Sequence, residues 1–514
     1  MTRAVVIGGG VSGLATACLL ARDGHEVTLL ERHAEFGGRA GVWEHEGFTF
    51  DTGPSWFLMP EVFDHFYRLM GTSTSEQLDL VGLSPGYRVY GEPESSPSAP
   101  LDVRAGAAEE LFESREPGAA GRIRRYLVSA GAAYDSAVKS FLYNPFSSWR
   151  SLASRHVLAA APAVLPLLTR SLWSFIARRF TDLRLRQILA YPAVFLGTSP
   201  FEAPALYHLM SHLDLTAGVQ YPRGGFGRVV SSLVDLARAN GVDLRSESDV
   251  VRIDSSDGAV RSVTFARHGA TARIDADIIV SCVDEHHTET VLLEEADRSY
   301  PERRWRKQVT GPSAVLVMLG VEGELPELLH HTLFFANDWR DNFDAIFSAP
   351  GRIPSPPSLY VCRPSATDDG VASAGHENLF VLVPIPPDPA IGRGGIAGGG
   401  DARVEAIADA AVTQIADWAG IPDLTSRVRV RRTVGPADFA ERFNTFRGSA
   451  LGPAHTLTQS AFLRGVTRSK RVSGLYYGGA TTVPGVGLPM CLISAELVLK
   501  HVRGDHSPGP LEEP

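Results

Sequence analysis

The stretch AVVIGGGVSG, residues 4–13, constrains this chain more than any other, because a short apolar run leads directly into closely spaced glycines. The β-branched residues before Gly8 predict a strand buried on both faces. Residues 12–23 then favour a helix, with apolar side chains recurring every three or four positions, and Gly24 predicts its end. A second apolar run at 25–30 predicts another strand. The first thirty residues therefore predict a βαβ unit.

The glycine spacing in this unit predicts a site for a dinucleotide. Gly8 permits a tight turn, Gly10 lets the backbone approach a pyrophosphate, and Gly13 lets helix and strand pack closely. The helix N-terminus offers unpaired N–H groups to the phosphates. Glu31 follows the second strand, where its carboxylate can accept hydrogen bonds from ribose hydroxyls, and its charge disfavours the 2′-phosphate of NADP. A glycine-rich turn in some other α/β protein is the alternative.

The segment after Glu31 favours FAD over NAD. The run ERHAEFGGR at 31–39 resembles the extended FAD fingerprint of the amine oxidase and carotenoid desaturase superfamily, and FDTGP at 50–54 resembles the segment that follows it there. The resemblance implies that the first run follows the diphosphate and ribityl chain of the flavin, and that the second lies beside the isoalloxazine ring. The cofactor-binding residues it implies here are Arg32, Gly37, Gly38, Arg39, Gly53 and Pro54.

The likeness resumes near the other end of the chain. Residues 479–489, GATTVPGVGLP, and the helical run from Ile493 resemble the C-terminal flavin segment of the bacterial-type phytoene desaturases. There a helix N-terminus points at the pyrimidine edge of the ring, where its dipole would stabilise arriving electron density. The backbone of Val250 or Val251 would contact the adenine by the same resemblance; a plain core valine is the alternative. The further cofactor-binding residues are Val251, Gly479, Ala480, Pro484, Gly485, Gly487, Leu488 and Pro489.

Shorter segments between these ends, such as QYPRGGF at 220–226, also look like this family, so the likeness spans almost the whole chain. It departs from the family at Thr481 and Met490, where we expect glycine, and at the bulky pair Trp56 and Phe57. These departures concern the substrate more than the flavin.

The resemblance implies an α/β fold in which a Rossmann-type, glutathione-reductase-like FAD-binding domain is interleaved with an α+β substrate domain. At 514 residues the chain is also long enough for more than one core. A helical, membrane-associating region is expected as well. The expected ranges are 1–75, 220–290 and 470–505 for FAD, 76–135 and 291–469 for the substrate, 136–219 for the helical region, and 506–514 for a disordered tail.

The run from His156 to Phe180 is apolar, but Pro162, Pro166 and Arg170 interrupt it, so it lacks the roughly 20 unbroken apolar residues of a spanning helix. Arginines flanking apolar faces fit a helical patch among anionic lipid headgroups, and a buried helical hairpin is the alternative. The resemblance favours the membrane, because these desaturases draw a water-insoluble substrate from the bilayer. The arginines concerned are Arg155, Arg170, Arg178, Arg179, Arg184 and Arg186.

Composition excludes several other classes of protein. Forty-nine basic and 58 acidic residues give a net charge of −9, which argues against a nucleic-acid binder. The four cysteines form no C-x-x-C pair and the sixteen histidines show no ligand spacing, so we expect neither disulfides nor a metal. The first residues lack a signal-peptide pattern. We expect a cytoplasmic protein associated with the inner face of the cell membrane.

The resemblance implies FAD-dependent desaturation of phytoene toward lycopene, by hydride transfer to the flavin and loss of a proton. A phytoene-type substrate has no polar group for a side chain to grip, so the flavin must do the chemistry and we name no catalytic residue. Oxygen or a membrane quinone would reoxidise the flavin. Other possibilities are desaturation, saturation or isomerisation of another acyclic carotenoid or polyene, amine oxidation, and a carotenoid carrier without turnover.

The protein's part would be an apolar tunnel against the ring that excludes water. His330 and His331 could be proposed as bases, but a structural role is favoured. The residues we expect on the inner wall, with core packing as the alternative, are Trp56, Phe57, Met59 and Met490, together with Leu488 and Pro489.

Overall fold

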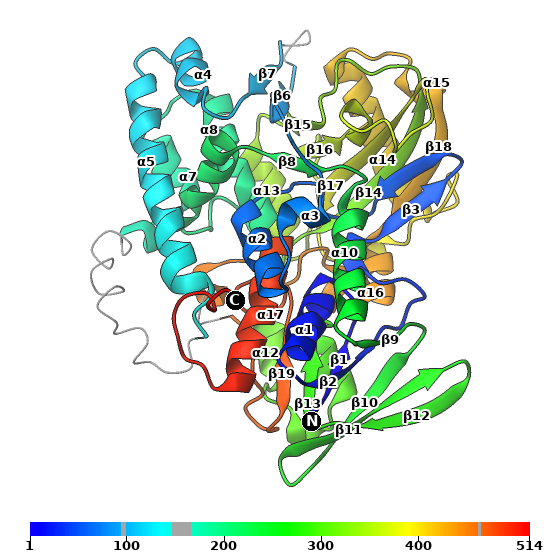
Figure 1. The fold of residues 1–514 in the computed structure, drawn as a ribbon. Coiled ribbons are helices and arrows are strands. Elements are labelled where there is room, and N and C mark those ends of the chain that lie inside the picture. Colours follow the sequence, from blue (N-terminus) through cyan, green and yellow to red (C-terminus); the bar gives the residue numbers. More distant parts are fainter. Residues whose placement is uncertain (94–98, 146–165, 461–463) are drawn as a thin grey trace.

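The computed structural model describes residues 1–93, 99–145, 166–460 and 464–514. A five-stranded parallel sheet forms one end of the molecule, in the order β19-β13-β1-β2-β9 (Figure 1). The strands are short and apolar because both faces of the sheet are covered. They are β1 (Arg3–Ile7), β2 (Glu26–Leu30), β9 (Asp243–Arg245), β13 (Ile278–Ser281) and β19 (Leu475–Tyr477).

Different layers cover the two faces of this sheet. Ala4 and Val6 of β1 face a core built with the helices α1, α10 and α17, whereas Val5 and Ile7 face a core shared with a three-stranded antiparallel sheet. This alternation along one strand is what places helices on one face and a second sheet on the other. The helices are α1 (Val11–Arg22), α10 (Phe226–Ala239) and α17 (Leu488–Arg503); the strands are β10 (Asp249–Ser256), β11 (Ala259–Arg267) and β12 (Ala270–Asp275).

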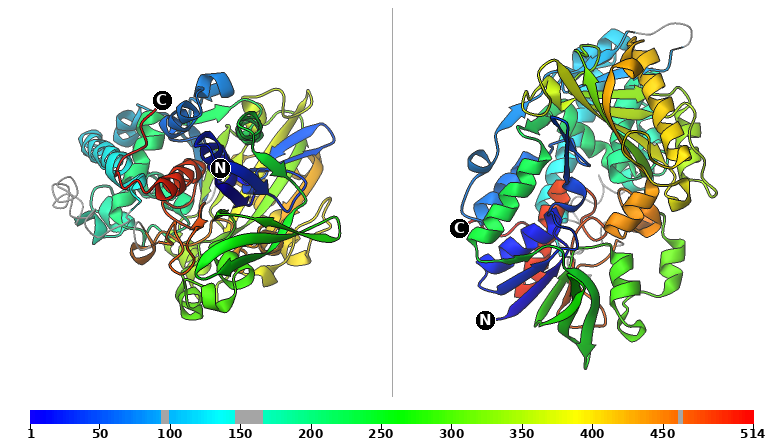
Figure 2. Two further views of the ribbon diagram at one scale, coloured as in Figure 1. Left: turned by 60° about the horizontal axis from the view of Figure 1, so that its bottom comes forward. Right: turned by 90° about the vertical axis from the view of Figure 1, so that its right-hand side faces the viewer.

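A mixed seven-stranded sheet forms the opposite end of the molecule, in the order β18-β14-β17-β16-β15-β6-β7 (Figures 1 and 2). One face packs on the long helix α14 (Ala402–Ala419), and the other packs on a group of helices from residues 108–190. The second face also borders the site described below. The strands are β6 (Tyr87–Gly91), β7 (Leu101–Val103), β14 (Ser313–Glu322), β15 (His331–Phe335), β16 (Leu359–Cys362), β17 (His376–Ile385) and β18 (Val428–Val434).

Smaller elements complete the fold. The helices over the inner face of the seven-stranded sheet are α4 (Ala108–Arg115), α5 (Ala120–Ala137), α7 (Leu172–Ala177), α8 (Leu183–Ala190) and the 3-10 helix η4 (Tyr191–Leu196). The other helices include α2 (Pro60–Leu69), α3 (Thr74–Gln77), α9 (Met210–His212), α11 (Glu285–His287), α12 (Glu302–Lys307), α13 (Trp339–Phe347), α15 (Leu424–Arg427) and α16 (Pro436–Phe443). Two strand pairs remain, β3 (Val42–His45) with β4 (Phe48–Asp51), and β5 (Leu80–Gly82) with β8 (Gln220–Pro222).

The structure corrects one part of the expected membrane patch. Leu172, Phe175 and Ile176 of α7 are buried in the core beside α8 and the seven-stranded sheet, so this apolar face packs inward. Arg179 donates to the Phe175 carbonyl and lies over the Phe175 ring, and Arg184 donates to the Phe335 carbonyl. Residues 156–165 of the predicted patch lie outside the described residues. No described helix is long and apolar enough to cross a bilayer.

The expected disorder of the tail at 506–514 is also corrected. The Lys500 ammonium is fully buried at the end of α17 and donates to the carbonyls of Tyr143, Ser507 and Gly509. A buried cation needs such acceptors, and the returning tail supplies two of them. Glu513 then contacts His65 on α2. The tail is therefore ordered by partners that its composition does not reveal.

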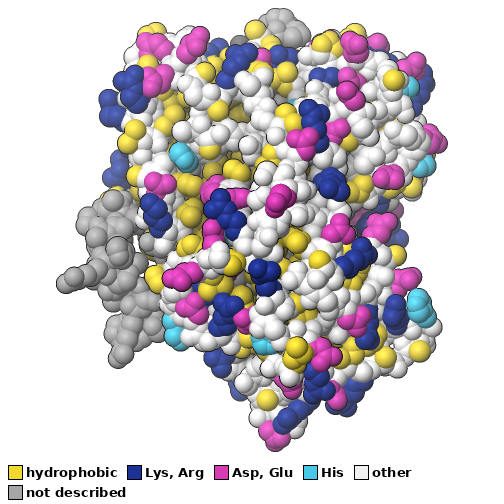
Figure 3. Space-filling model, in the orientation of Figure 1, with side chains coloured by type: hydrophobic (Ala, Val, Ile, Leu, Met, Phe, Trp, Pro, Cys, Tyr) yellow, Lys and Arg dark blue, Asp and Glu magenta, His cyan; other side chains and the backbone are white. Residues whose placement is uncertain are grey.

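Acidic and basic side chains alternate over the face of the molecule shown in Figure 3. No large area of one sign stands out on that face, in keeping with the modest net charge of −9.

Candidate cofactor and substrate site

One large, mainly apolar cavity of about 810 Å³ joins the two sheets. Ile7 and Leu30 at the ends of β1 and β2 line it on one side. Leu333, Phe335 and Phe380 of the seven-stranded sheet line it on the other. A cavity that opens beyond the carboxyl ends of parallel strands is the usual ligand position in such folds.

The glycine loop between β1 and α1 forms part of this wall as the sequence predicts. A Cβ atom on Gly13 would lie 1.8 Å from the carbonyl oxygen of Gly8, so the helix can pack on the loop only with glycine there. Gly8 has a φ of +98°. Gly10 precedes α1 without any side-chain cap, which leaves the first N–H groups of the helix available to a ligand. Gly8 and Gly10 line the cavity, whereas Gly13 lies behind them.

Glu31 has a structural task in addition to the predicted one. Its buried carboxylate accepts hydrogen bonds from the backbone N–H of Gly9 at 2.6 Å and of His33 at 2.8 Å. It thereby holds the glycine loop to the next segment. Because a carboxylate has about four acceptor positions, Glu31 keeps capacity for a ribose hydroxyl on its cavity side.

The second glycine segment lies directly against the first. The Gly37 N–H donates to the Gly9 carbonyl, and Gly10 and Gly37 form a short parallel bridge. Arg32 lines the cavity and donates to Asn444 after α16 at 3.0 Å. The predicted residues of this segment and its continuation that line the cavity are Arg32, Gly37, Gly38, Arg39, Gly53 and Pro54.

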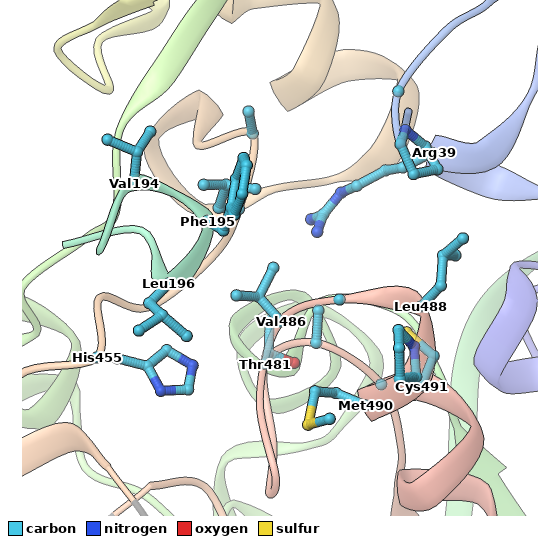
Figure 4. A pocket seen from close by; sticks show the side chains of 18 of the residues that line it. Arg39, Val194, Phe195, Leu196, His455, Thr481, Val486, Leu488, Met490 and Cys491 are labelled. Carbon is cyan, nitrogen blue, oxygen red and sulfur yellow. The ribbon is translucent and has the colours of Figure 1, made fainter. Parts of the chain in front are cut away.

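Arg39 provides the clearest test of whether this site fits FAD. Burial lowers the pKa of its guanidinium, although Asp284 and Cys491 partly offset this effect. Among the described residues it has no hydrogen-bond or ion-pair partner, and in Figure 4 it extends into the open space of the cavity. A buried cation aimed at a cavity requires an anion, and a diphosphate beside the glycine loop supplies one. The residues present therefore fit the predicted cofactor.

The C-terminal segment closes the cavity from a third side. Gly479 donates its N–H to Ser494 at 2.9 Å, and α17 begins after Gly487 without a side-chain cap. The uncapped N–H groups of this helix are thus a second positively polarised helix end beside the cavity. The predicted residues that line the cavity here are Gly479, Ala480, Pro484, Gly487, Leu488 and Pro489.

Besides Gly13, two further predicted cofactor residues do not reach the cavity. Gly485 packs against the His455 ring, where a Cβ atom would lie only 2.3 Å from the imidazole. Val251 is 46% exposed, whereas its neighbour Val250 is buried and lines the cavity. Of the two valines considered, Val250 thus lines the cavity and Val251 does not. Successive residues of a strand point to opposite faces, so a shift of one position reverses the assignment.

Some of the residues predicted for the inner wall line the cavity and one does not. Trp56, Met59 and Met490 line the cavity. Phe57 does not line it; the ring is buried and stacks on Phe63 with centroids 4.3 Å apart. Phe57 therefore has the packing role that was its alternative.

His330 and His331 lie behind the cavity wall and do not line it. Burial lowers the pKa of His330 to about 3, and burial with the His330 charge lowers the pKa of His331 well below its usual value, so both rings are neutral near pH 7. The His331 ring stacks on Trp56, with centroids 4.2 Å apart. Together with Cys362, opposite His331 on β16, they form a buried group of possible metal ligands within 4.8 Å of one another. The sequence spacing does not reveal that group.

Sequence reasoning missed several residues that line the cavity. Tyr191, Phe195 and Leu196 come from η4, and Tyr207 and His455 come from separate loops. In Figure 4, Phe195 lies across the open space from Arg39, and His455 lies near Leu196. No motif marks these residues; the only signal is the aromatic content of YPAVFL at 191–196.

Known proteins resemble this chain over nearly its whole length. A family model described as flavin containing amine oxidoreductase matches residues 11–498. The carotenoid 3,4-desaturase of Haloarcula japonica is 41% identical over 493 residues, which cover 96% of each chain. The zeta-carotene-forming phytoene desaturase of Myxococcus xanthus is 33% identical over 506 residues, which cover 97% of this chain and 93% of that one.

Among solved structures, an oxidoreductase from Methanosarcina mazei has a TM-score of 0.65 at 16% identity, covering 97% of this chain and 100% of its own. Putrescine oxidase with bound putrescine has a TM-score of 0.58 at 13% identity, covering 98% of this chain and 99% of its own. At these identities the likeness concerns the fold alone.

Proposed function

We propose that the substrate of this chain is an acyclic carotenoid, which it desaturates at a terminal 3,4 bond. The chain belongs to the flavin-containing amine oxidoreductase family and, within it, to the carotenoid desaturases, so it is an FAD-dependent oxidoreductase that desaturates carotenoids. The observation that carries the general activity is one cavity that has the dinucleotide loop on one wall and apolar side chains on the others. The choice of bond is supported by the greater identity to the 3,4-desaturase, 41% against 33%.

Desaturation of phytoene toward lycopene is the second candidate. It is supported by the 33% identical phytoene desaturase of Myxococcus xanthus, whose alignment covers 97% of this chain. Both candidates need the same chemistry and differ in how far along the cavity the reacting bond must lie.

Bound FAD supplies the two-electron oxidant for this reaction. The residues of this chain supply binding, orientation and dryness. Arg39 and the uncapped start of α1 would hold the anionic part of the cofactor, and the start of α17 would offer further N–H groups. Apolar side chains of the seven-stranded sheet, among them Leu333 and Phe380, exclude water from the reacting bond.

No side chain is needed as a strong base, because a carotenoid cation loses a proton readily. His455 lines the cavity, and its Nδ1 lies 3.0 Å from the Tyr207 hydroxyl. Burial, with a smaller contribution from Arg464, keeps its pKa well below the usual range, so the ring is neutral. A neutral imidazole is a weak base, and His455 is the residue of this site that best fits the role of proton acceptor.

Anaerobic incubation of the FAD-loaded protein with liposomes that carry one carotenoid tests the proposal. Lycopene should bleach the flavin and give polyene bands at longer wavelength, whereas phytoene should give neither. Bleaching by phytoene alone, with stepwise appearance of lycopene bands, would establish the second candidate. An oxidised flavin that persists with both substrates bound would contradict carotenoid desaturation. Admitting oxygen or a quinone afterwards identifies the acceptor by the rate of flavin reoxidation.

We also propose that the protein works at the inner surface of the cell membrane, because its substrate dissolves in the bilayer. Phe141, Leu142 and Leu168 line the cavity, so apolar side chains form its wall there. Flotation with vesicles of anionic lipid should carry the protein upward, and zwitterionic vesicles should carry less of it. Equal absence from both kinds of vesicle would contradict membrane association.

A further inference from the structure

Four aromatic side chains form a continuous wall of the cavity. Trp56 lies 5.4 Å from Phe195, 6.0 Å from Tyr191 and 6.1 Å from Tyr360, measured between ring centroids. Tyr191 and Phe195 are 5.5 Å apart. All four line the cavity, and we refer to Trp56, Tyr191, Phe195 and Tyr360 as the aromatic cluster.

A buried carboxyl group stands behind this cluster. Asp214 accepts hydrogen bonds from the hydroxyl groups of Tyr191 at 2.8 Å and Tyr87 at 2.9 Å, both through Oδ2. It is 4% exposed, and among the described residues its Oδ1 has no partner. Burial raises the pKa of Asp214 to about 7, opposed by the two tyrosine hydrogen bonds, so ionisation of this group is poised near neutrality. A positive charge in the cavity would favour the ionised form.

No cationic side chain belongs to the cluster itself. The neighbouring imidazole of His331 stacks on Trp56 but is neutral, because burial lowers its pKa far below the usual value. The arginines and lysines among the described residues that line the cavity are Arg32, Arg39 and Arg442. They belong to the segment 31–39 and to α16, on the cofactor side. Figure 4 shows Arg39 facing Phe195 across the space.

This distribution of charge suits one kind of occupant. Aromatic rings attract cations through their negative faces, and the attraction grows when the cation is desolvated. A carboxylate in a low-dielectric wall adds to it. A neutral polyene gains nothing from these groups beyond packing, since the same volume of leucine would bury it equally well.

We propose that the aromatic cluster, with Asp214 behind it, is a cation-binding site that stabilises the positively charged conjugated chain formed during desaturation. The proposal rests on the proposed function. In that reaction an allylic C–H bond breaks and both of its electrons leave with the hydrogen as hydride, for which the flavin is the acceptor. The remaining carbon cation is delocalised over the existing double bonds. An adjacent C–H bond then loses its proton to His455, the proposed proton acceptor, and its electron pair forms the new double bond.

Binding of a stable cation tests the site without turnover. The probe is a linear polyprenyl chain with one internal quaternary dimethylammonium, and its matched partner carries a dimethyl-substituted carbon in place of the nitrogen. Equilibrium dialysis of the radiolabelled probes, below their micelle concentrations, gives the ratio of the two dissociation constants for the full chain with and without FAD. The ratio cancels differences in apolar packing.

The ratio should shift against the ammonium probe by about two- to thirtyfold in Trp56→Leu, with Trp56→Phe intermediate. Asp214→Asn keeps the size and an acceptor oxygen for the two tyrosines but removes the charge, and it should shift the ratio in the same direction. Trp339→Leu is the matched control, because Trp339 lines the same cavity but is not part of the cluster. Its ratio should equal that of the unchanged protein.

The proposal is overturned if Trp56→Leu and Asp214→Asn leave the ratio unchanged, or if Trp339→Leu shifts it equally. Should Asp214→Asn fail to fold, as far-UV circular dichroism would show, the graded series at Trp56 decides alone. Desaturation with an unchanged ratio refutes the cation site only. A shifted ratio in a protein that desaturates no carotenoid refutes the proposed function and leaves the cation site standing. In an active enzyme the same variants should slow single-turnover flavin reduction without weakening carotenoid binding.

Discussion

At the scale of single residues, steric limits and unpaired charges make this site specific. Gly13 has no room for a side chain, because any Cβ atom would lie 1.8 Å from the Gly8 carbonyl oxygen. Arg39 has the opposite character, since its charge has space in front of it and no described partner. Both features are explained by a bound dinucleotide.

Gly13→Ala should release FAD. The added methyl group forces α1 away from the loop, at a cost of about 1–3 kcal/mol. The purified variant should lack the flavin absorption bands that the unchanged protein shows. Gly82→Ala is the matched control, because no atom lies within 4 Å of the position of its Cβ. Retention of FAD by Gly13→Ala at unchanged affinity would mean that the loop does not hold the cofactor.

Arg39→Met should have opposite effects on the free protein and on its complex. Removing a buried cation without a partner should leave the FAD-free protein equally stable or more stable. Loss of the charged hydrogen bonds should weaken FAD binding by about 1.5–3 kcal/mol. Thermal melting without FAD and a fluorescence titration with FAD measure the two effects. Exposed Arg267→Met should change neither, and weakened FAD-free stability in Arg39→Met would show that the guanidinium has a structural partner.

At the scale of elements, the C-terminal tail is attached to α2 and α17 through charged groups. His65 of α2 lies 3.0 Å from Glu496 of α17 and 2.9 Å from Glu513 of the tail. Burial lowers the pKa of His65, but the two carboxylates raise it more, so its net pKa lies above the usual value. The hydrogen bonds to His65 and Arg68 lower the pKa of Glu513. The two shifts set the pH range in which the tail stabilises the fold.

Glu513→Gln should therefore destabilise the protein by an amount that depends on pH. The stabilisation by protonated His65 is complete below its unfolded pKa of about 6.5 and disappears as pH rises through its higher folded pKa. The stabilisation by ionised Glu513 is complete above its unfolded pKa of about 4.3 and disappears as pH falls through its lower folded pKa. Urea unfolding at pH 5.5 should give the largest difference between the variant and the unchanged protein. At pH 9 the difference should shrink to the part that Arg68, which stays charged, contributes with Glu513. A constant difference at both pH values would contradict this account.

Truncation after Gly504 should destabilise the protein, because the buried Lys500 ammonium then loses two of its three carbonyl acceptors. The double change, truncation with Lys500→Met, should recover part of the loss, since an apolar side chain needs no acceptor. Urea unfolding at one pH compares the three proteins. If Lys500→Met worsens the truncated protein instead, the buried charge is not the cause of its instability.

At the scale of the whole molecule, the chain crosses repeatedly between the two ends. The parallel sheet takes strands from residues 3–30, 243–281 and 475–477, and the seven-stranded sheet takes its strands from residues 87–103 and 313–434. The cavity between them is built from both. The chain returns to the parallel sheet after β7 and again after β18, so the strands of the two sheets alternate along the sequence.

This interleaving predicts that FAD stabilises the entire protein. A ligand present at 100 times its dissociation constant adds about 2.7 kcal/mol to the free energy of unfolding. Release of flavin fluorescence and loss of far-UV circular dichroism should therefore occur together and at a higher temperature than in the FAD-free protein. Arg39→Met should reduce this rise. Two separate transitions, of which only one responds to FAD, would show that the two ends unfold independently.

The sequence by itself determined the cofactor half of this protein. The βαβ unit follows from local periodicity, and the need for glycine at positions 8 and 13 follows from local sterics, so both could be predicted from a short stretch. The predicted carotenoid desaturase family and FAD are confirmed by the match over residues 11–498 and by the desaturase relatives. The predicted α/β fold with a parallel sheet is confirmed as well, and the structure shows that its second sheet is mixed.

The tertiary structure alone decided the substrate half. Trp56, Tyr191 and Tyr360 lie far apart in sequence and meet only because strands and helices from different segments pack around one cavity. Whether Val250 or Val251 faces that cavity depends on one step of strand register, which a run of two identical residues cannot specify. The order of the tail depends on the buried Lys500, whose partners come from other parts of the chain. Local pattern fixes which elements form, whereas long-range packing fixes which side chains meet.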